Sequence, residues 1–405
     1  MSPRWRVLAL MTGAQAGASV VQQALGSLSP ILVGTFALSK AQLGIVFTAL
    51  MLGSTAFTAL AGALTDKWGE KKMLLAAGAL MAAGLLGAAA LVSYPWLIAC
   101  MTVYGAGYAV STPAGGRAIL TWFDRDRGFA MGVRQAGVPL GGTVGALALP
   151  VLAQLPGGYR TAFVVSALLV AVPTLFAYAF YEDAPSAANG AAPPRVRDLL
   201  RGMTTLARDP RLIAVTVTSM VLVSVQLAMN AFVTVTGVVD VGLAAGIAAL
   251  AFALAQATAI AGRLWWGFAS DRFFGGDRLV PFALICVIAV IACAALGVLH
   301  RGAVVPLFVA SALLGLSGAG WNGLMAAAMV EVGGAERAAS ALGLALTAIY
   351  GASAIAPWAF GVLADATSLR VAWLATATLA FAGVGPVLWL RARLAAAPAP
   401  RPREV

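Results

Sequence analysis

Three arginines lie inside apolar runs of the sequence, at Arg117, Arg134 and Arg263. None has an acidic residue beside it within its run, although Asp271 follows Arg263 after two helical turns. A charge at the depth of a bilayer costs at least ~3 kcal/mol, so it is normally retained for a ligand pathway or for a structural ion pair. A guanidinium group also presents a planar fork of donors that matches carboxylate oxygens. These arginines therefore predict chemistry in which an anion binds and leaves.

The composition places these arginines in a membrane protein. The chain is 61% hydrophobic and only 10% charged, and its mean hydropathy is +0.92. Soluble domains are closer to half apolar and about a quarter charged. The apolar runs are long enough to cross ~30 Å of hydrocarbon as helices, and the alternating pattern of a transmembrane barrel is absent from the sequence. We expect an all-α polytopic membrane protein.

Hydropathy predicts twelve transmembrane helices, with boundaries that are soft by a few residues. The break between the seventh and eighth is placed by the glycines and the aspartate of Val-Thr-Gly-Val-Val-Asp-Val-Gly. The predicted spans are 7–33, 42–64, 73–92, 96–122, 129–154, 160–181, 212–236, 243–268, 279–298, 304–330, 339–363 and 371–390.

Basic residues predict the orientation of these spans. With the N-terminus inside, 19 of the 26 Lys and Arg fall on the cytoplasmic side, and only Lys40, Arg160, Arg301 and Arg370 fall outside. This bias predicts a multi-pass protein of the cell inner membrane with both termini in the cytoplasm. It also accounts for the net charge of +11, so nucleic-acid binding is an unnecessary interpretation. The alternative of an N-terminal signal peptide would leave an odd number of spans.

The segment 182–211 divides the chain into two halves. It begins as a linker rich in Pro and Ala. Five apolar residues then recur at helical spacing: Val196, Leu199, Leu200, Met203 and Leu206. This spacing predicts a short amphipathic helix on the cytoplasmic leaflet, with a solvated loop as the alternative. The predicted parts are an N-terminal six-helix bundle over 1–181, the linker 182–211, a C-terminal six-helix bundle over 212–390 and a cytoplasmic tail over 391–405.

A short pattern recurs in the two halves, which makes them pseudo-symmetric. Gly62-Ala-Leu-Thr-Asp66-Lys67 follows the second span, and Gly267-Phe-Ala-Ser-Asp271-Arg272 follows the eighth. Glycine permits close helix approach, and the charged residues can contact neighbouring helix ends in one state and release them in another. We expect these charges to form gates at the cytoplasmic face: Asp66, Lys67, Asp271, Arg272, Arg127 and Arg337.

This repeated pattern, together with the twelve spans, resembles the major facilitator superfamily of secondary transporters across essentially the whole chain. Gly62 to Lys72 is similar to the signature of that superfamily after its second span, with Lys67 where arginine is frequent. Gly137-Val-Pro139-Leu-Gly-Gly in the fifth span partly resembles an element of its antiporter branch, but Val138 interrupts the element. For that segment, tight packing of small residues is the favoured interpretation.

The sequence around Arg263 gives a finer resemblance. Arg263-Leu-Trp-Trp-Gly267-Phe-Ala-Ser-Asp271 resembles the eighth-span pattern of oxalate/formate exchangers, monocarboxylate transporters and nitrate porters. In those branches the arginine binds the anion, so the resemblance implies an anionic substrate held by Arg263. This chain departs from them in having Ala259 where the monocarboxylate branch has an acid. It also lacks the lysines of the first and eleventh spans and the Asn-Gly-rich signatures of nitrate porters.

Helix direction ranks the three arginines. Side chains tilt toward the helix N-terminus, so Arg263 and Arg117, on inward-running spans, should lean toward the membrane midplane. We expect Arg263 to be the main anion anchor and Arg117 to be its partner, although Pro113 interrupts that helix. Arg134 lies on an outward-running span and should lean toward the cytoplasmic loops. There it could snorkel or pair with an acidic residue (Asp124, Asp126 or Asp66), so it is the weaker candidate for substrate binding.

Neutral polar residues near mid-span in both halves complete the predicted cavity. Each alone is better explained by an interhelical hydrogen bond, but their distribution indicates a site between the two bundles. The candidates are Gln22, Gln23, Tyr108, Gln226, Asn230, Gln256, Trp321, Asn322 and Tyr350.

The sequence therefore predicts a monomeric secondary transporter of a small organic anion, such as a carboxylate, working by alternating access. Protons or a counter-anion remain open as coupling partners. We expect no catalytic residues, cofactor or metal site, since the chain has one His and its three Cys lack metal-ligand spacing. Two alternatives stay open: a drug or metabolite efflux antiporter of the same fold, and a membrane sensor that does not transport.

Overall fold

The computed structural model describes residues 3–123, 127–181 and 208–395, without the side chains of some helical positions, among them Asp66, Arg127 and Arg337. The described residues form helices and no strand. Ten helical segments of this part of the chain are long and apolar enough to cross a membrane. The predicted amphipathic helix at 196–206 lies outside the described residues.

The N-terminal set of helices begins with a nearly continuous helical segment. The first segment runs from α1 through the short 3-10 helix η1 to α2, and Ala37, in the left-handed conformation, ends it. The Ser39 hydroxyl and the Gln42 side chain then cap α3 reciprocally. The elements are α1 (Pro3–Ala24), η1 (Leu25–Leu28), α2 (Ser29–Phe36), α3 (Lys40–Trp68), α4 (Glu70–Ala90), α5 (Tyr94–Trp122), α6 (Arg127–Leu152) and α7 (Tyr159–Phe180).

Small residues let the N-terminal helices approach closely. A Cβ added to Gly141 would collide with the carbonyl oxygen of Ala16, and one added to Gly145 would approach the carbonyl of Val20. The glycines of the fifth predicted span therefore pack α6 against α1, which supports the structural interpretation of that segment.

The C-terminal set begins where Asp209 accepts a hydrogen bond from the Arg211 amide and so caps α9. Of the helices that follow, α14 is also capped by a side chain, because the Ser368 hydroxyl accepts a hydrogen bond from the Val371 amide. The elements of this set are α9 (Pro210–Val239), α10 (Ala245–Phe273), α11 (Leu279–Gly297), α12 (Val304–Leu316), α13 (Asn322–Ala366), α14 (Leu369–Ala382) and α15 (Val384–Ala395).

The tenth predicted span differs from the sequence-based expectation in two ways. It breaks at residues 317–321, between α12 and α13, because three glycines weaken the helix there: Gly315, Gly318 and Gly320. Beyond the break, residues 331–338 have helical conformation and belong to α13, so the expectation of a non-helical loop there is wrong.

The path of α13 nevertheless reverses. Glu331 pairs with Arg278 at the α10–α11 connection, whereas Asp365 pairs with Lys40 at the opposite end of the molecule. A straight helix of 45 residues would be about 67 Å long, more than twice the hydrocarbon thickness. Helix α13 therefore supplies the part of the tenth predicted span that follows the break and the whole of the eleventh.

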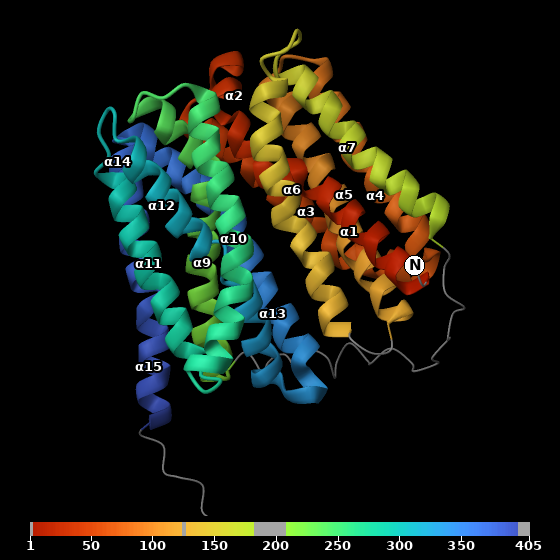
Figure 1. The fold of residues 1–405 in the computed structure, drawn as a ribbon, viewed down its shortest axis with the longest axis vertical. Coiled ribbons are helices and arrows are strands. Elements are labelled where there is room, and N and C mark those ends of the chain that lie inside the picture. Colours follow the sequence, from red (N-terminus) through yellow and green to blue (C-terminus); the bar gives the residue numbers. More distant parts are fainter. Residues whose placement is uncertain (1–2, 124–126, 182–207, 396–405) are drawn as a thin grey trace, which may run out of the picture.

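The two sets of helices meet along α3 with α13, α6 with α10, and η1 and α2 with α9 (Figure 1). Hydrogen bonds between described residues of the two sets lie toward the end that contains Lys40. There Asp365 accepts from the backbone amides of Lys40 (3.0 Å) and Ala41 (2.7 Å), and Thr48 donates to the Ala354 carbonyl (2.6 Å). The ribbons of α6 and α10 diverge toward the other end (Figure 1).

Candidate functional site

Arg263 lies where α10 crosses the break between α12 and α13. The crossing is tight, because a Cβ on Gly262 would lie 3.0 Å from the Cα of Gly320. The carbonyl of Ala319, which belongs to the non-helical break, accepts a hydrogen bond of 3.4 Å from Nε of Arg263 and one of 3.3 Å from the Asn322 amide. The break therefore holds the inner part of the guanidinium and leaves its terminal nitrogens for another ligand.

No carboxylate of the described residues lies within ion-pairing distance of Arg263, in agreement with the absence of an acid from its apolar run. Asn322 and Gly323, beside it, form the first turn of α13, where backbone N–H groups lack intrahelical acceptors. The arginine and this helix N-terminus together create a positive potential inside the bundle, which favours an anion.

Arg263 opens onto a cleft of about 410 Å³ between the two sets of helices. One wall comes from α6 and the other from α10 and the start of α13. The lining residues are Met131, Gly132, Gln135, Ala136, Pro139, Ile260, Arg263, Leu264, Asn322, Gly323 and Ala326. This volume falls within the range of about 300–1,000 Å³ that is usual for small-molecule sites.

Tyr108 connects the cleft arginine to the N-terminal set. Its hydroxyl lies close enough to Arg134 and to Arg263 to interact electrostatically with both, and Tyr350 lies within the same range of Tyr108. The Gln15 amide donates to the Tyr108 hydroxyl at 3.4 Å and to Ser19 at 3.2 Å. The structure therefore brings one predicted residue, Tyr108, into the neighbourhood of Arg263, and a second, Tyr350, into the neighbourhood of Tyr108.

Arg134 is buried, with 1% of its surface exposed. It donates from Nη2 to the Gln15 side chain at 2.7 Å and to the Ser111 carbonyl at 3.3 Å. The expectation that it snorkels to the cytoplasmic loops is wrong, because Gly115 leaves room for the guanidinium against α5. Asp124 and Asp126, two of its predicted partners, lie outside the described residues, as does the side chain of Asp66.

Arg117 is placed differently from the expectation. Its Nε lies 2.8 Å from a carboxylate oxygen of Glu70, the first residue of α4. Arg117 therefore has an acidic partner and lies at the end of the bundle, so the expectation that it leans toward the midplane and joins Arg263 is wrong. The interpretation failed because the partner lies in another helix, 47 positions earlier in the chain.

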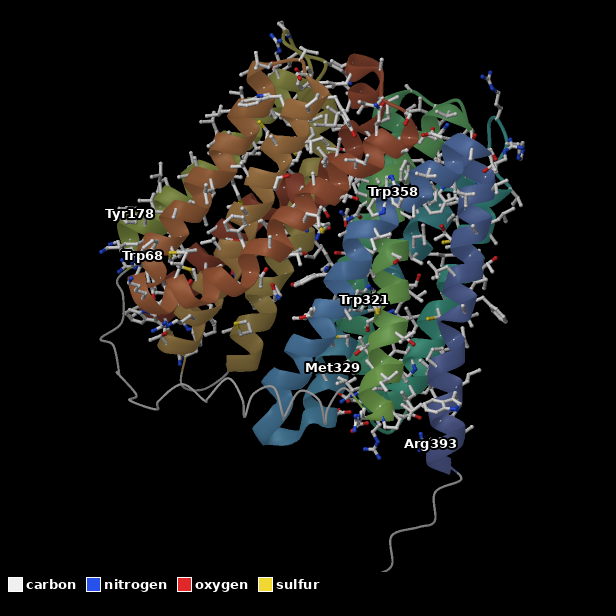
Figure 2. The ribbon with its side chains drawn as sticks, turned by 180° about the vertical axis from the view of Figure 1, so that it is seen from behind. Trp68, Tyr178, Trp321, Met329, Trp358 and Arg393 are labelled. Carbon is white, nitrogen blue, oxygen red and sulfur yellow. The ribbon has the colours of Figure 1, made fainter. Side chains whose placement is uncertain are left out.

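The other polar candidates mainly make contacts between helices or are buried in the core. Gln23 accepts from the Asn230 amide at 3.2 Å, and its carbonyl accepts from Gln256 at 2.8 Å, so these three residues join the two sets of helices. The backbone of Gln22 donates to Tyr104, and Gln226 is buried in α9. Trp321 is only 1% exposed and packs in the core of the C-terminal set (Figure 2), so it does not line the cleft.

One predicted gating residue, Asp271, contacts a residue of its own half. Asp271 accepts from Arg278 at 2.6 Å, and Arg278 also binds Glu331 at 2.7 Å. Hydrogen bonds to Glu331 and Asp271 raise the pKa of the Arg278 guanidinium. Lys67 and Arg272 are exposed, and the side chains of Asp66, Arg127 and Arg337 lie outside the described residues.

Sequence reasoning missed four charged residues that organise the ends of the helices: Glu70, Arg278, Glu331 and Asp365. The sequence contains a signal that could have identified Asp365, since this residue follows an apolar run and falls at the same end of the predicted bundle as Lys40. Within the described part of the chain, no group of His, Cys, Asp and Glu has the arrangement of a metal site.

Comparison with known proteins agrees with this architecture. The profile of the Major Facilitator Superfamily matches residues 11–357. An uncharacterised MFS-type transporter of Mycobacterium tuberculosis is 26% identical over 375 residues, which cover 91% of this chain and 81% of that protein. A probable sulfoacetate transporter of Cupriavidus necator is 31% identical over 160 residues, covering 39% of this chain and 36% of the relative.

Among solved structures, a bacterial homologue of the human lysosomal transporter Spinster, inward-facing and unoccupied, superposes with a TM-score of 0.85 at 15% identity, covering 99% of both chains. That likeness shows the fold. With the family match over most of the chain, it follows that this multi-pass membrane protein belongs to the Major Facilitator Superfamily and is a transporter rather than an enzyme.

Proposed function

We propose that this transporter carries a small organic anion, a carboxylate or a sulfonate, across the cell inner membrane by alternating access. The observation that carries the proposal is Arg263: a guanidinium at the interface of the two sets of helices, beside a broken helix, with no carboxylate partner among the described residues. Such a charge is costly in a bilayer unless a ligand neutralises it during each cycle.

Two further observations support an anion. The N-terminus of α13 adds its own positive potential next to Arg263. A relative over part of the chain is a probable sulfoacetate transporter, which makes a carboxylate or sulfonate a sensible first ligand to test.

The charges at the two ends support a direction of opening. The α10–α11 end carries Arg278 and Arg272, and the end of α15 carries Arg391 and Arg393 (Figure 2). The Arg393 guanidinium carbon lies 5.4 Å from the centre of the Trp389 ring. We assign this end to the cytoplasm from the positive-inside bias. The end closed by Lys40 and Asp365 then faces outward, and the cleft at Arg263 belongs to an inward-facing state.

The proposal is tested by thermal unfolding of the purified full-length protein with a panel of ligands: acetate, succinate, sulfoacetate and nitrate, with tetraphenylphosphonium as a lipophilic cation. A ligand that binds only the folded state at one hundred times its Kd adds about 2.7 kcal/mol to stability, which thermal unfolding resolves. A carboxylate or sulfonate should stabilise the wild type, Arg263→Lys should respond partially and Arg263→Gln should respond weakly.

Equal stabilisation of the wild type and both variants would contradict the role of Arg263. Stabilisation by tetraphenylphosphonium alone would instead favour an efflux antiporter of the same fold. Arg160→Gln is a matched control, because Arg160 is an exposed arginine at the outer end of α7.

A further inference from the structure

The cleft beside Arg263 is mainly apolar away from the arginine. Six apolar residues from α6, α10 and α13 form its walls: Met131, Ala136, Pro139, Ile260, Leu264 and Ala326. Arg263, Gln135 and Asn322 are its polar side chains. The site therefore has a cationic end and an apolar body, and a compact hydrophilic anion would leave most of the body unfilled.

The shape of the cleft follows from how α6 and α10 diverge. The two helices touch on the outer side, where a Cβ on Gly142 would lie 3.0 Å from the Gln256 amide. Three turns earlier on α6, a Cβ on Gly132 would have nothing within 4 Å. The helices have separated at that level, and the space between them begins at Arg263.

The exposed wall residues show that the cleft extends toward the periphery of the bundle. Leu264, next to Arg263, is 71% exposed, and Gln135 and Gly132 on the facing helix are also exposed. A chain of methylenes placed there would contact apolar side chains on both helices while its anionic head stayed at the guanidinium. A sugar or a second charged group placed there would lose hydration without gaining hydrogen-bond partners.

We propose that the substrate is an amphipathic organic anion, whose carboxylate or sulfonate head binds Arg263 and whose apolar tail lies in the cleft between α6 and α10. This inference rests on the proposed function and names the substrate class of the same site. The cationic end fixes the head, and the walls select the tail by burying its apolar surface.

The test uses the full-length protein in nanodiscs of phosphatidylcholine, with empty nanodiscs as the blank. Binding of acetate, butanoate, hexanoate and octanoate is measured by calorimetry, with octylammonium as the charge control. Each methylene buried in the cleft should improve affinity by up to about fourfold until the cleft is full. Octylammonium should not bind, because its ammonium head is positively charged and is repelled by the Arg263 guanidinium.

Gly132→Leu fills the cleft from a position with open space and so should fold normally. It should weaken octanoate about tenfold or more, and acetate by less than about threefold, because only the tail competes with the new side chain. Gly34→Leu is the matched control: Gly34 is also an exposed helical glycine with nothing within 4 Å of an added Cβ, but it lies in α2 and outside the cleft.

The outcomes separate the two proposals. If Arg263→Gln abolishes binding of every carboxylate, but affinity does not change with chain length and Gly132→Leu has no effect, the tail proposal fails and the anion site stands. If no anion binds, or if Arg263→Gln binds all of them normally, the proposed function itself fails. If phosphatidylglycerol in the nanodiscs displaces octanoate completely, the cleft belongs to a lipid and the tail proposal is overturned.

Discussion

Removing the Asp365 carboxylate should open the Lys40 end of the transporter, which we propose to be the outer end. Asp365 belongs to the C-terminal set, and it accepts hydrogen bonds from the backbone amides of Lys40 and Ala41 in the N-terminal set, at 3.0 and 2.7 Å. These amides start α3, where a negative charge is favourable. The bonds can exist only while the two sets stay together at this end, so Asp365→Ala should destabilise the closed arrangement selectively.

The size of the effect follows from the geometry. Hydrogen bonds to a charged group contribute about 1.5–3 kcal/mol each when buried. The Asp365 side chain is 30% exposed and its contact with Lys40 Nζ is 3.5 Å, so water competes for both. We therefore expect a loss of about 2 kcal/mol for the whole cluster, which changes the ratio of closed to open outer ends ~30-fold.

Distance measurement by electron spin resonance tests this. Spin labels on Arg160→Cys in α7 and Arg301→Cys beyond α11 span the outer end, and the three native cysteines are buried. Asp365→Ala should add a population at longer distance that is small or absent in the unsubstituted protein. Asp209→Ala is the matched control, because Asp209 caps α9 within its own half. An unchanged distance distribution in Asp365→Ala, or the same change in both variants, would refute the reasoning.

Three further predictions follow from the described contacts. Arg117→Gln should lower the unfolding temperature, because it breaks the ion pair with Glu70, whose side chain is 9% exposed, and it should leave anion affinity unchanged. Reduced anion affinity in a calorimetric titration would instead show that Arg117 belongs to the binding site. Gly115→Ala should cost about 1–3 kcal/mol, because its Cβ would lie 2.8 Å from the Arg134 guanidinium, whereas Gly116→Ala would meet only Met131, at 3.8 Å, and should change thermal unfolding little. Burial raises the pKa of the Asp240 carboxyl, so the folded state favours its neutral form and the stability contributed by this group rises as pH falls through that pKa. Asp240→Asn should therefore raise the unfolding temperature at pH 7 and lose this advantage below about pH 4. An increase in unfolding temperature that does not depend on pH would contradict this prediction.

The sequence was sufficient for the class of protein, and it singled out the arginine on which the proposed function rests. Apolar length and the positive-inside bias are strong local signals, and Arg263 stands out because nothing acidic accompanies it. Ion-pair and hydrogen-bond partners in other helices could not be predicted from the sequence. Arg117 looked unpaired because Glu70 opens a different helix, and Asp365 is 325 positions from the amide that it caps. Pairing of that kind depends on helix packing, which no spacing within one run encodes.

The break at 317–321 shows an intermediate case. Its glycines are visible in the sequence, but hydropathy continues through them, so a continuous span was the simpler interpretation. Tertiary packing decides the outcome: Gly262 of α10 crosses Gly320 closely, and the Trp266 indole donates to the Leu316 carbonyl at 2.8 Å, which satisfies an acceptor at the end of α12. The break matters because it supplies the Ala319 carbonyl that holds Arg263.

The most direct test of the central claim is exchange of a radiolabelled anion in proteoliposomes, using the carboxylate or sulfonate that stabilises the protein most. The wild type should exchange the label against the same unlabelled anion. Arg263→Gln should lose at least about tenfold in exchange rate at low substrate, corresponding to the ~1.4 kcal/mol or more that a charge-assisted contact contributes. Exchange by Arg263→Gln at the wild-type rate, with both proteins reconstituted to equal density, would contradict an anion site at Arg263.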